Sequence, residues 1–92
     1  MSSKITVIGA GSWGTALANL LAKNGHKVNI YARDKAVFNS INENNLNQKY
    51  FPDYKLNPRL KAINNLDAEL NKSDIIVISV PTQALKSVLM QI

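Results

Sequence analysis

The chain alternates between short apolar runs and longer segments in which apolar residues recur at helical spacing. The short runs predict four strands, because they are apolar and bounded by turn residues. These strands cover residues 5–8, 28–32, 60–63 and 74–80. The other segments predict helices over residues 13–23, after Asp34, over 66–70 and over 85–92. This alternating order predicts an α/β fold with a doubly wound parallel sheet.

The apolar positions also predict which faces are buried. In the first helix, one stripe at helical spacing holds Ala16, Leu17, Leu20 and Leu21. Asp34 is placed to cap the next helix, whose expected buried residues are Ala36, Val37, Phe38 and Ile41. The run over residues 74–80 is apolar throughout, so it predicts a central strand of a parallel sheet, ended by Pro81.

The first strand is followed directly by Gly9–Gly14, a Gly-Ala-Gly-Ser-Trp-Gly segment with the GxGxxG spacing. Between a strand and a helix, this spacing is typical of a turn that holds the pyrophosphate of a dinucleotide. Gly9 allows the tight turn, Gly11 lets the pyrophosphate approach the backbone, and Gly14 lets the helix pack close to the strand. The free N–H groups and the dipole of the helix N-terminus then face the anion.

Two other interpretations of this turn are weaker. A glycine-rich connection without a ligand has no need of three glycines at this spacing. A P-loop would share the separation of Gly9 and Gly14, but it requires a lysine where Thr15 stands. The turn therefore predicts a dinucleotide site rather than a nucleoside triphosphate site.

Arg33 and Asp34 follow the second strand, where Rossmann-type sites contact the adenosine ribose. An acidic residue there holds the 2′-hydroxyl of NAD, whereas an arginine accommodates the 2′-phosphate of NADP. Asp34 has two interpretations, a ribose ligand or a helix cap, and we favour the cap. The expected cofactor is NADPH, with NADH as the alternative.

Composition limits the class of protein. The 92 residues are 46% hydrophobic and 18% charged, which predicts one small globular domain. There is no cysteine, so disulfides and thiolate metal sites are excluded, and we expect no metal site. The net charge of +5 comes from lysines and arginines spread without a run, and nucleic-acid-binding motifs are missing. We expect an anionic small ligand, no nucleic acid partner, no membrane span and a cytoplasmic location.

Three polar features have structural interpretations. His26, the single histidine, precedes the second strand. Because ligands bind at the carboxyl ends of parallel strands, we expect His26 in a surface turn and not as a catalytic base. The asparagine-rich stretch over residues 42–47 is interpreted as a solvated helix end or loop. Lys86, in the last helix, is expected to be solvated.

Four segments together resemble the bacterial NAD(P)-dependent glycerol-3-phosphate dehydrogenase family over essentially the whole chain. They are residues 9–18, 32–34, 47–52 and 78–85. The resemblance implies a Rossmann-type fold, NADPH or NADH as cofactor, and reduction of dihydroxyacetone phosphate to sn-glycerol 3-phosphate for phospholipid synthesis. It also implies that Ser12 and Trp13 contact the cofactor, that Arg33 lies near the adenosine ribose, and that Tyr50 lies near the cofactor cleft. Without it, Trp13 is interpreted as a core aromatic and Tyr50 as a loop anchor.

The resemblance also implies a longer protein. Family members continue into a lysine-bearing segment and a helical substrate domain, so residues 1–92 are expected to form a partial N-terminal NAD(P)-binding domain, truncated before completion. No catalytic residue is assigned in this chain, which we expect to be inactive alone, while the complete protein would act on a triose phosphate as a homodimer. One local departure is Asp53, where the family has glycine. The alternative functions are the dinucleotide-binding module of another Rossmann dehydrogenase and a non-catalytic NAD(P)-binding module.

Overall fold

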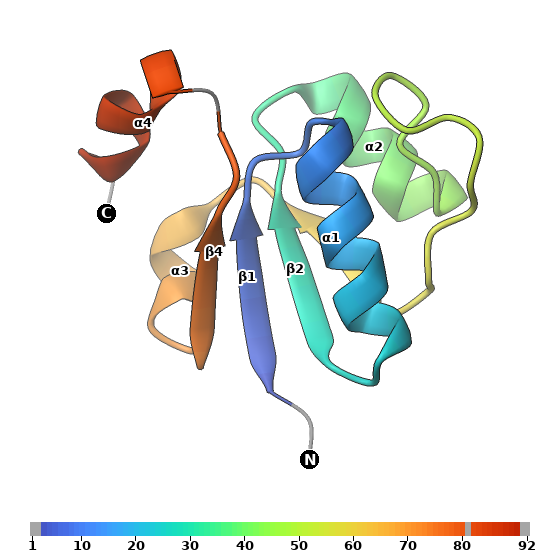
Figure 1. Ribbon diagram of the computed structural model, residues 1–92, viewed down its shortest axis with the longest axis horizontal. Coiled ribbons are helices and arrows are strands. Elements are labelled where there is room, and N and C mark those ends of the chain that lie inside the picture. Colours follow the sequence, from blue (N-terminus) through green and yellow to red (C-terminus); the bar gives the residue numbers. More distant parts are fainter. Residues whose placement is uncertain (1–2, 81, 91–92) are drawn as a thin grey trace.

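The computed structural model describes residues 3–80 and 82–90, which form a parallel sheet surrounded by helices (Figure 1). The strands are β1 (Lys4–Ile8), β2 (Lys27–Tyr31), β3 (Leu60–Ile63) and β4 (Ile75–Ile78). The helices are α1 (Ser12–Lys23), α2 (Lys35–Asn44), α3 (Leu66–Leu70) and α4 (Thr82–Leu89). The sheet order is β3-β2-β1-β4, and every neighbouring pair is parallel. The predicted α/β class is confirmed; Pro81 and Ile92 lie outside the described residues.

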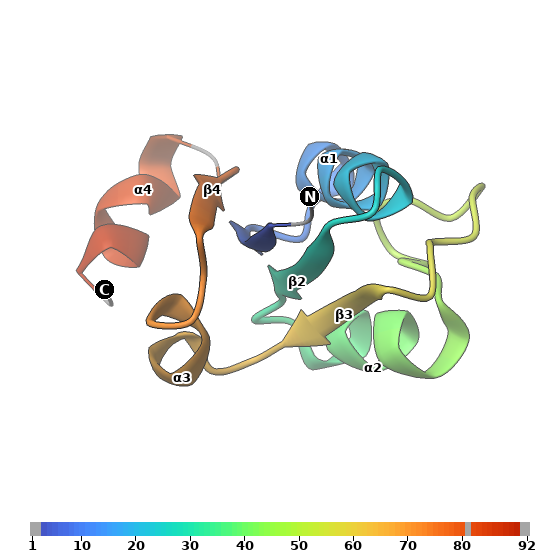
Figure 2. The ribbon, with the colours of Figure 1, turned by 90° about the horizontal axis from the view of Figure 1, so that it is seen from below.

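The helices form layers on the two faces of the sheet. Figure 2 shows α1 on one face, with α2 and α3 on the other. β1 lies between β2 and β4, and its residues 5–8 are all buried. Apolar side chains from β1, β2, β3, α1 and α2 form the main core. Because all strands run the same way, their carboxyl ends lie together at one end of the sheet. Gly9, Arg33 and Ser79 follow their strands at this end.

The first helix approaches the sheet through small residues, which corrects the expected stripe. Leu20 is 55% exposed, and Ala16 and Leu17 are only partly buried. The buried positions of α1 are instead Gly14, Thr15, Ala18, Asn19 and Ala22. Small side chains let the helix backbone lie close to β1 and β2, and larger ones on this face would hold it away. In α2, Val37 and Ile41 are buried as expected, but Ala36 is exposed.

The most apolar strand, β4, was expected to be central, but it is not central among the strands that the structure describes. β4 pairs with β1 alone and forms an edge of the described sheet. Ile75, Ile76 and Ile78 are 47%, 42% and 39% exposed, and α4 lies beyond this edge (Figures 1 and 2). Leu85 and Leu89 of α4 are also exposed, as is Lys86, which was expected to be solvated. An apolar run identifies a strand made for burial, but it does not locate the strand within the sheet.

Local backbone conformation follows the sequence closely at the ends of the helices. Gly25, just after α1, has a φ of 94°, the left-handed conformation expected there. Asp34 is the N-cap of α2, as predicted. Asn45 ends α2 with a φ of 53°, and it is the one non-glycine residue with positive φ among those described. Asp53 therefore does not adopt the conformation that would favour glycine.

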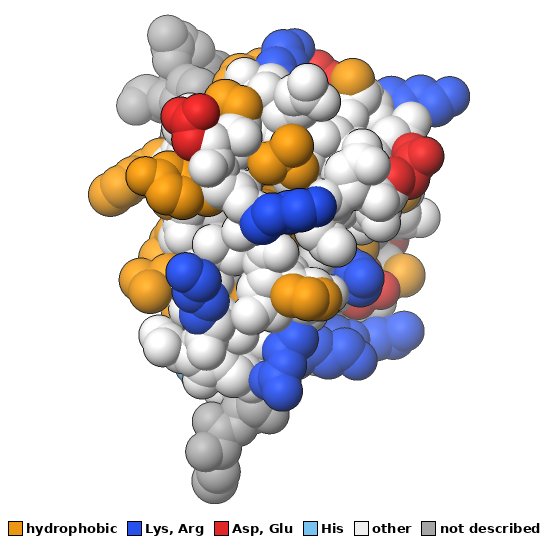
Figure 3. Space-filling view, turned by 90° about the vertical axis from the view of Figure 1, so that its right-hand side faces the viewer, with side chains coloured by type: hydrophobic (Ala, Val, Ile, Leu, Met, Phe, Trp, Pro, Cys, Tyr) orange, Lys and Arg blue, Asp and Glu red, His pale blue; other side chains and the backbone are white. Residues whose placement is uncertain are grey.

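On the face shown in Figure 3, basic side chains are more frequent than acidic ones, and several of them lie together toward its lower end. None of the helices in the described part of the chain is long and apolar enough to cross a membrane.

Candidate functional site

The turn after β1 depends on glycine for steric reasons. Gly9 has a φ of 118°, which side chains disfavour. A Cβ on Gly9 would collide with the backbone carbonyl of Ser79, which follows β4. The Ser79 N–H in turn donates to the Ile8 carbonyl at 2.8 Å. The expected tight turn at Gly9 is therefore also the place where the chain after β4 packs against the end of β1.

Gly14 and Gly11 differ in what surrounds them. A Cβ on Gly14 would collide with the Gly9 carbonyl, so this glycine lets α1 approach the end of β1 as predicted. Gly11 has an ordinary φ of −74°, and a Cβ built there would meet no atom within 4 Å. Neither backbone strain nor protein packing demands glycine at this position. The open space next to Gly11 leaves room for a ligand to approach the backbone.

The N-terminus of α1 is suited to a negatively charged group. Its N-cap, Gly11, offers no side chain to the first-turn N–H groups, and the first turn contains no acidic residue. Uncapped N–H groups and the positive end of the helix dipole favour an anion at this end. Ser12, at the start of the helix, donates its hydroxyl to the carbonyl of Tyr50 at 2.6 Å. Ser12 thus joins the helix to the segment between α2 and β3.

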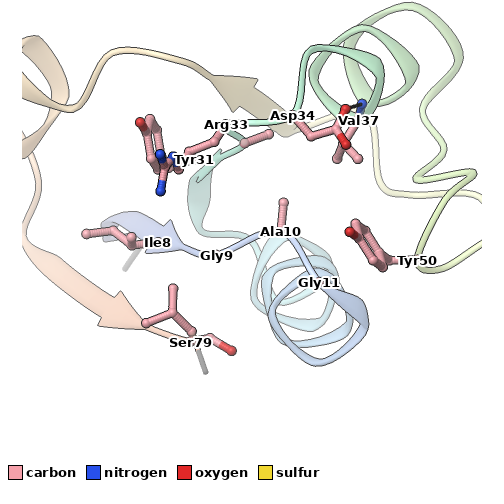
Figure 4. Close-up of a pocket in the computed structure, with 12 residues that line it drawn as sticks. Ile8, Gly9, Ala10, Gly11, Tyr31, Arg33, Asp34, Val37, Tyr50 and Ser79 are labelled. Atoms are coloured by element: carbon pink, nitrogen blue, oxygen red, sulfur yellow. Dashed lines mark hydrogen bonds between the residues drawn. The ribbon is translucent and has the colours of Figure 1, made fainter. Parts of the chain in front are cut away.

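A cleft of about 330 Å³ lies beside the glycine turn, across the carboxyl ends of β1 and β2. Figure 4 shows Gly9, Ala10 and Gly11 along one side of the cleft and Arg33 and Asp34 at the end of β2. The remaining lining residues are Ile8, Tyr31, Ala32, Val37, Tyr50, Ser79 and Val80. The structure therefore brings four residues of the predicted site, Gly9, Gly11, Arg33 and Tyr50, to one cavity whose walls come from four separate segments of the chain. The other three, Ser12, Trp13 and Gly14, line a neighbouring hollow instead.

Arg33 and Asp34 differ in their surroundings. Arg33 is exposed, and its side chain and that of Asp34 extend in different directions from the end of β2 (Figure 4). Asp34 accepts hydrogen bonds from the N–H groups of Ala36 at 2.8 Å and Val37 at 3.3 Å. Its other carboxylate oxygen lies 2.7 Å from Nζ of Lys49. The hydrogen bond from Lys49, together with the two backbone N–H groups, lowers the pKa of Asp34 below its usual range.

The two aromatic residues of the predicted site are both accessible. Tyr50 is 42% exposed and lines the cleft, although its backbone is anchored to Ser12 and to Asn47. Trp13 is 80% exposed, so its interpretation as a core aromatic is wrong. It borders a second hollow between α1 and the end of β4, together with Gly11, Leu17, Ile78 and other residues. Their roles toward a cofactor stay predictions.

Asn47 is the residue that the sequence interpretation missed. It was assigned to a solvated stretch, yet its side chain is fully buried at 0% exposure. Its Nδ2 donates to the Ala10 carbonyl at 2.9 Å and to Oγ1 of Thr15 at 2.8 Å, while Oδ1 accepts from the N–H of Tyr50 at 3.1 Å. Asn47 therefore connects the glycine turn, α1 and the Tyr50 segment. Nothing in the composition of an asparagine-rich stretch distinguishes this residue from its solvated neighbours.

His26 does not line this cleft. It precedes β2 and so lies at the amino end of the strands, opposite to the end that holds the glycine turn. Its Nδ1 accepts a hydrogen bond from the N–H of Ser3 at 3.1 Å. This position agrees with a residue in a connecting turn. No group of three potential metal ligands occurs among the residues that the structure describes.

The geometry fits a dinucleotide on two counts. The space at Gly11 is open where a pyrophosphate would need it, and the uncapped end of α1 points N–H groups at the same place. The parallel sheet and the strand-turn-helix arrangement at its switch between β1 and β4 define a Rossmann-type dinucleotide-binding domain. The chain belongs to the family described as the NAD-dependent glycerol-3-phosphate dehydrogenase N-terminus, which matches residues 4–92.

Curated relatives agree with this family. The chain is 45% identical over 92 residues to glycerol-3-phosphate dehydrogenase [NAD(P)+] from Halothermothrix orenii and 42% identical to that from Lactiplantibacillus plantarum. Each match covers 100% of this chain and 27% of the relative. The chain thus spans about a quarter of the length of these relatives.

Solved structures show the same relationship. Glycerol-3-phosphate dehydrogenase from Coxiella burnetii superposes with a TM-score of 0.90 at 36% identity, covering 98% of this chain and 28% of that one. The enzyme from Saccharomyces cerevisiae superposes with a TM-score of 0.88 at 30% identity, covering 99% and 30%. The resemblance drawn from the four sequence segments is therefore confirmed.

Proposed function

We propose that this chain is the cofactor-binding portion of a glycerol-3-phosphate dehydrogenase. The complete enzyme would interconvert dihydroxyacetone phosphate and sn-glycerol 3-phosphate with NADPH or NADH, for glycerophospholipid synthesis. The observation that carries this proposal is the glycine turn, with its open space at Gly11, beside a cleft at the carboxyl ends of β1 and β2. The reaction is inferred from the relatives, which are glycerol-3-phosphate dehydrogenases that use NAD(P)+.

The predicted site residues take roles that follow from their positions. Gly9 and Gly14 shape the turn, and Gly11 leaves space for the pyrophosphate beside the first-turn N–H groups of α1. Ser12 and Trp13 are placed at this helix end, next to the same space. Arg33, at the end of β2, would contact the adenosine ribose, and Tyr50, which also lines the cleft, would lie near the cofactor; their places in the lining support these roles.

The chemistry divides between this chain and the rest of the enzyme. The bound cofactor supplies the hydride that reduces the ketone. Within this chain, the residues of the cleft bind and orient the dinucleotide, and none is proposed to move a proton. Both cofactor and substrate must be held in attack geometry for hydride transfer. We therefore propose that residues 1–92 bind the cofactor as a partial domain and have no turnover alone.

The proposal extends to partners and location. A triose phosphate is the proposed substrate of the complete protein, which we propose to be a cytoplasmic homodimer that binds no nucleic acid. Size-exclusion chromatography with light scattering on the complete protein would measure its oligomeric state, and a monomer would contradict the dimer.

A chimera tests the activity directly. This chain would replace the matching N-terminal residues of the Halothermothrix orenii enzyme, to which it is 45% identical. We expect reduction of dihydroxyacetone phosphate by the chimera with NADPH or NADH, and none by the 92-residue chain. A folded chimera that binds the cofactor but reduces a different keto substrate would favour another Rossmann dehydrogenase. Cofactor binding without any reduction would favour a non-catalytic module.

A further inference from the structure

Lys49 lies next to the cleft, in a segment that has no regular secondary structure. It lies between α2 and β3, and its Nζ is 2.7 Å from a carboxylate oxygen of Asp34 at the end of β2. The same Nζ lies 5.2 Å from the centre of the Tyr50 ring, in a cation–π arrangement. Asp34 and Tyr50 both line the cleft. Lys49 therefore contacts two cleft residues that come from different segments.

The contact with Lys49 gives the second oxygen of the Asp34 carboxylate a partner within the protein. One oxygen accepts the N–H groups of Ala36 and Val37, and the other is engaged by Lys49. A carboxylate that holds the ribose 2′-hydroxyl of NAD must turn an oxygen toward that hydroxyl. In this chain the acidic group at the ribose position is instead committed to α2 and to Lys49.

The charge balance at this position follows from the same contacts. An unpaired carboxylate would repel a 2′-phosphate, whereas the Asp34–Lys49 pair has no net charge. Arg33 is exposed beside this pair and lines the cleft, so its positive charge is not cancelled there. An arginine is well suited to bind a phosphate group. The local charge therefore favours a cofactor that carries the 2′-phosphate.

We propose that Lys49 determines cofactor specificity by engaging Asp34, so that the cleft prefers a 2′-phosphorylated dinucleotide. This inference rests on the proposed cofactor-binding function and names the form of cofactor that the site prefers. Lys49 is a positioning residue in this account, because it acts through Asp34. An ion pair between side chains that are 53% and 37% exposed contributes little to folding stability. The ion pair therefore acts mainly on which form of the cofactor the cleft prefers.

The test compares the dissociation constants of NADPH and NADH for the 92-residue chain and for the chimera, by titration calorimetry. We expect Lys49→Gln to lower the preference for NADPH over NADH about tenfold, which corresponds to ~1.4 kcal/mol. Lys49→Arg keeps the charge and the ion pair, so it should retain the preference. Lys55→Gln is the matched control, since Lys55 lies in the same segment and contacts the Asn44 carbonyl.

The route through Asp34 has its own test. In an Asp34→Asn background the carboxylate charge is gone, so Lys49→Gln should change the preference much less than in the wild type. An undiminished effect in that background would overturn the route through Asp34. An unchanged preference in Lys49→Gln, with both cofactors still bound, would overturn the inference alone. Failure of the wild-type chain and the chimera to bind either cofactor would instead overturn the proposed function, and this inference with it.

Discussion

The backbone carbonyl of Ser79 occupies the space that a side chain on Gly9 would need. This contact joins the residue after β1 to the residue after β4, across 70 positions of sequence. It explains why the first glycine of the turn is fixed by the packing of the domain as well as by its φ of 118°. The third glycine has a similar constraint, because a Cβ on Gly14 would collide with the carbonyl of Gly9.

Gly9→Ala should therefore destabilise the fold strongly. The backbone strain costs about 1–3 kcal/mol, and the collision with Ser79 adds about 1–3 kcal/mol of overpacking. We expect a loss of roughly 3 kcal/mol or more in the free energy of unfolding, measured by urea denaturation. A loss below about 0.5 kcal/mol would show that the carbonyl of Ser79 does not confine this position.

Gly11→Ala is the matched comparison and should behave in the opposite way. The new Cβ meets no protein atom within 4 Å, and φ is ordinary. We expect the free energy of unfolding to change by less than about 1 kcal/mol. Cofactor affinity should fall at least about tenfold, because the methyl group enters the space proposed for the pyrophosphate. Unchanged affinity by calorimetry would contradict that use of the space.

Trp13→Ala should leave the fold intact and weaken binding. At 80% exposure the indole contributes little to the core, so the free energy of unfolding should change by less than about 0.5 kcal/mol. We expect the affinity for NADPH to fall about tenfold, or ~1.4 kcal/mol. In the wild-type chain, NADPH should quench the fluorescence of Trp13, the single tryptophan. Quenching absent at saturation would remove Trp13 from the site.

Asn47→Ala should cost more stability than its place in a polar loop indicates. The change removes the bond to the buried Thr15 hydroxyl and two partly buried bonds, to the Ala10 carbonyl and from the Tyr50 N–H. Each lost hydrogen bond costs about 0.5–1.5 kcal/mol, and truncating the buried side chain leaves a cavity. We expect a loss of about 3 kcal/mol in the free energy of unfolding and weaker cofactor binding.

Two variants separate the hydrogen bonds of Asn47 from other effects. Asn47→Asp keeps the size but loses the donor, so it should be at least as destabilising as alanine. Asn64→Ala is the control at an exposed asparagine and should stay within about 0.5 kcal/mol of the wild type. Equal effects at Asn47 and Asn64 would contradict the role of the buried amide.

The Asp34 cap and its exposed ion pair with Lys49 should give the stability a small dependence on pH at both extremes. The pKa of Asp34 is lowered from 3.8, chiefly by its hydrogen bond from Lys49. The ionised Asp34 therefore stabilises the fold fully above pH 3.8, and this stabilisation is lost as the pH falls below that value through the lowered pKa. The pKa of Lys49 is raised from 10.5, chiefly by Asp34, so that contribution is lost as the pH rises above this value.

The charge of Asp34 can be isolated with Asp34→Asn, which retains a side chain able to cap α2. The difference in melting temperature between this variant and the wild type should be present at pH 7 and vanish as the pH falls well below 3.8. An NMR titration should place the Asp34 midpoint below that value, and Lys49→Gln should raise it. A midpoint that Lys49→Gln leaves in place would contradict the pairing.

The features that the sequence determined by itself are those with local causes. The turn over residues 9–14, the cap at Asp34 and the left-handed Gly25 depend on hydrogen bonds and backbone conformations within a few residues. The alternation of short apolar runs and helical segments likewise fixed the α/β class, because each element must bury one face. These local signals, with the four matching segments, were sufficient to identify the family.

The tertiary structure decided the features whose partners are distant in sequence. Asn47 bonds with Ala10 and Thr15, which lie 37 and 32 positions away, and Lys49 meets Asp34 only because the chain after α2 returns to the end of β2. The position of β4 at the sheet edge and the small-residue face of α1 also depend on which elements lie together. The periodicity of a sequence shows which residues share one face of a helix or strand. Only the packing of the whole domain decides which other element, or solvent, that face contacts.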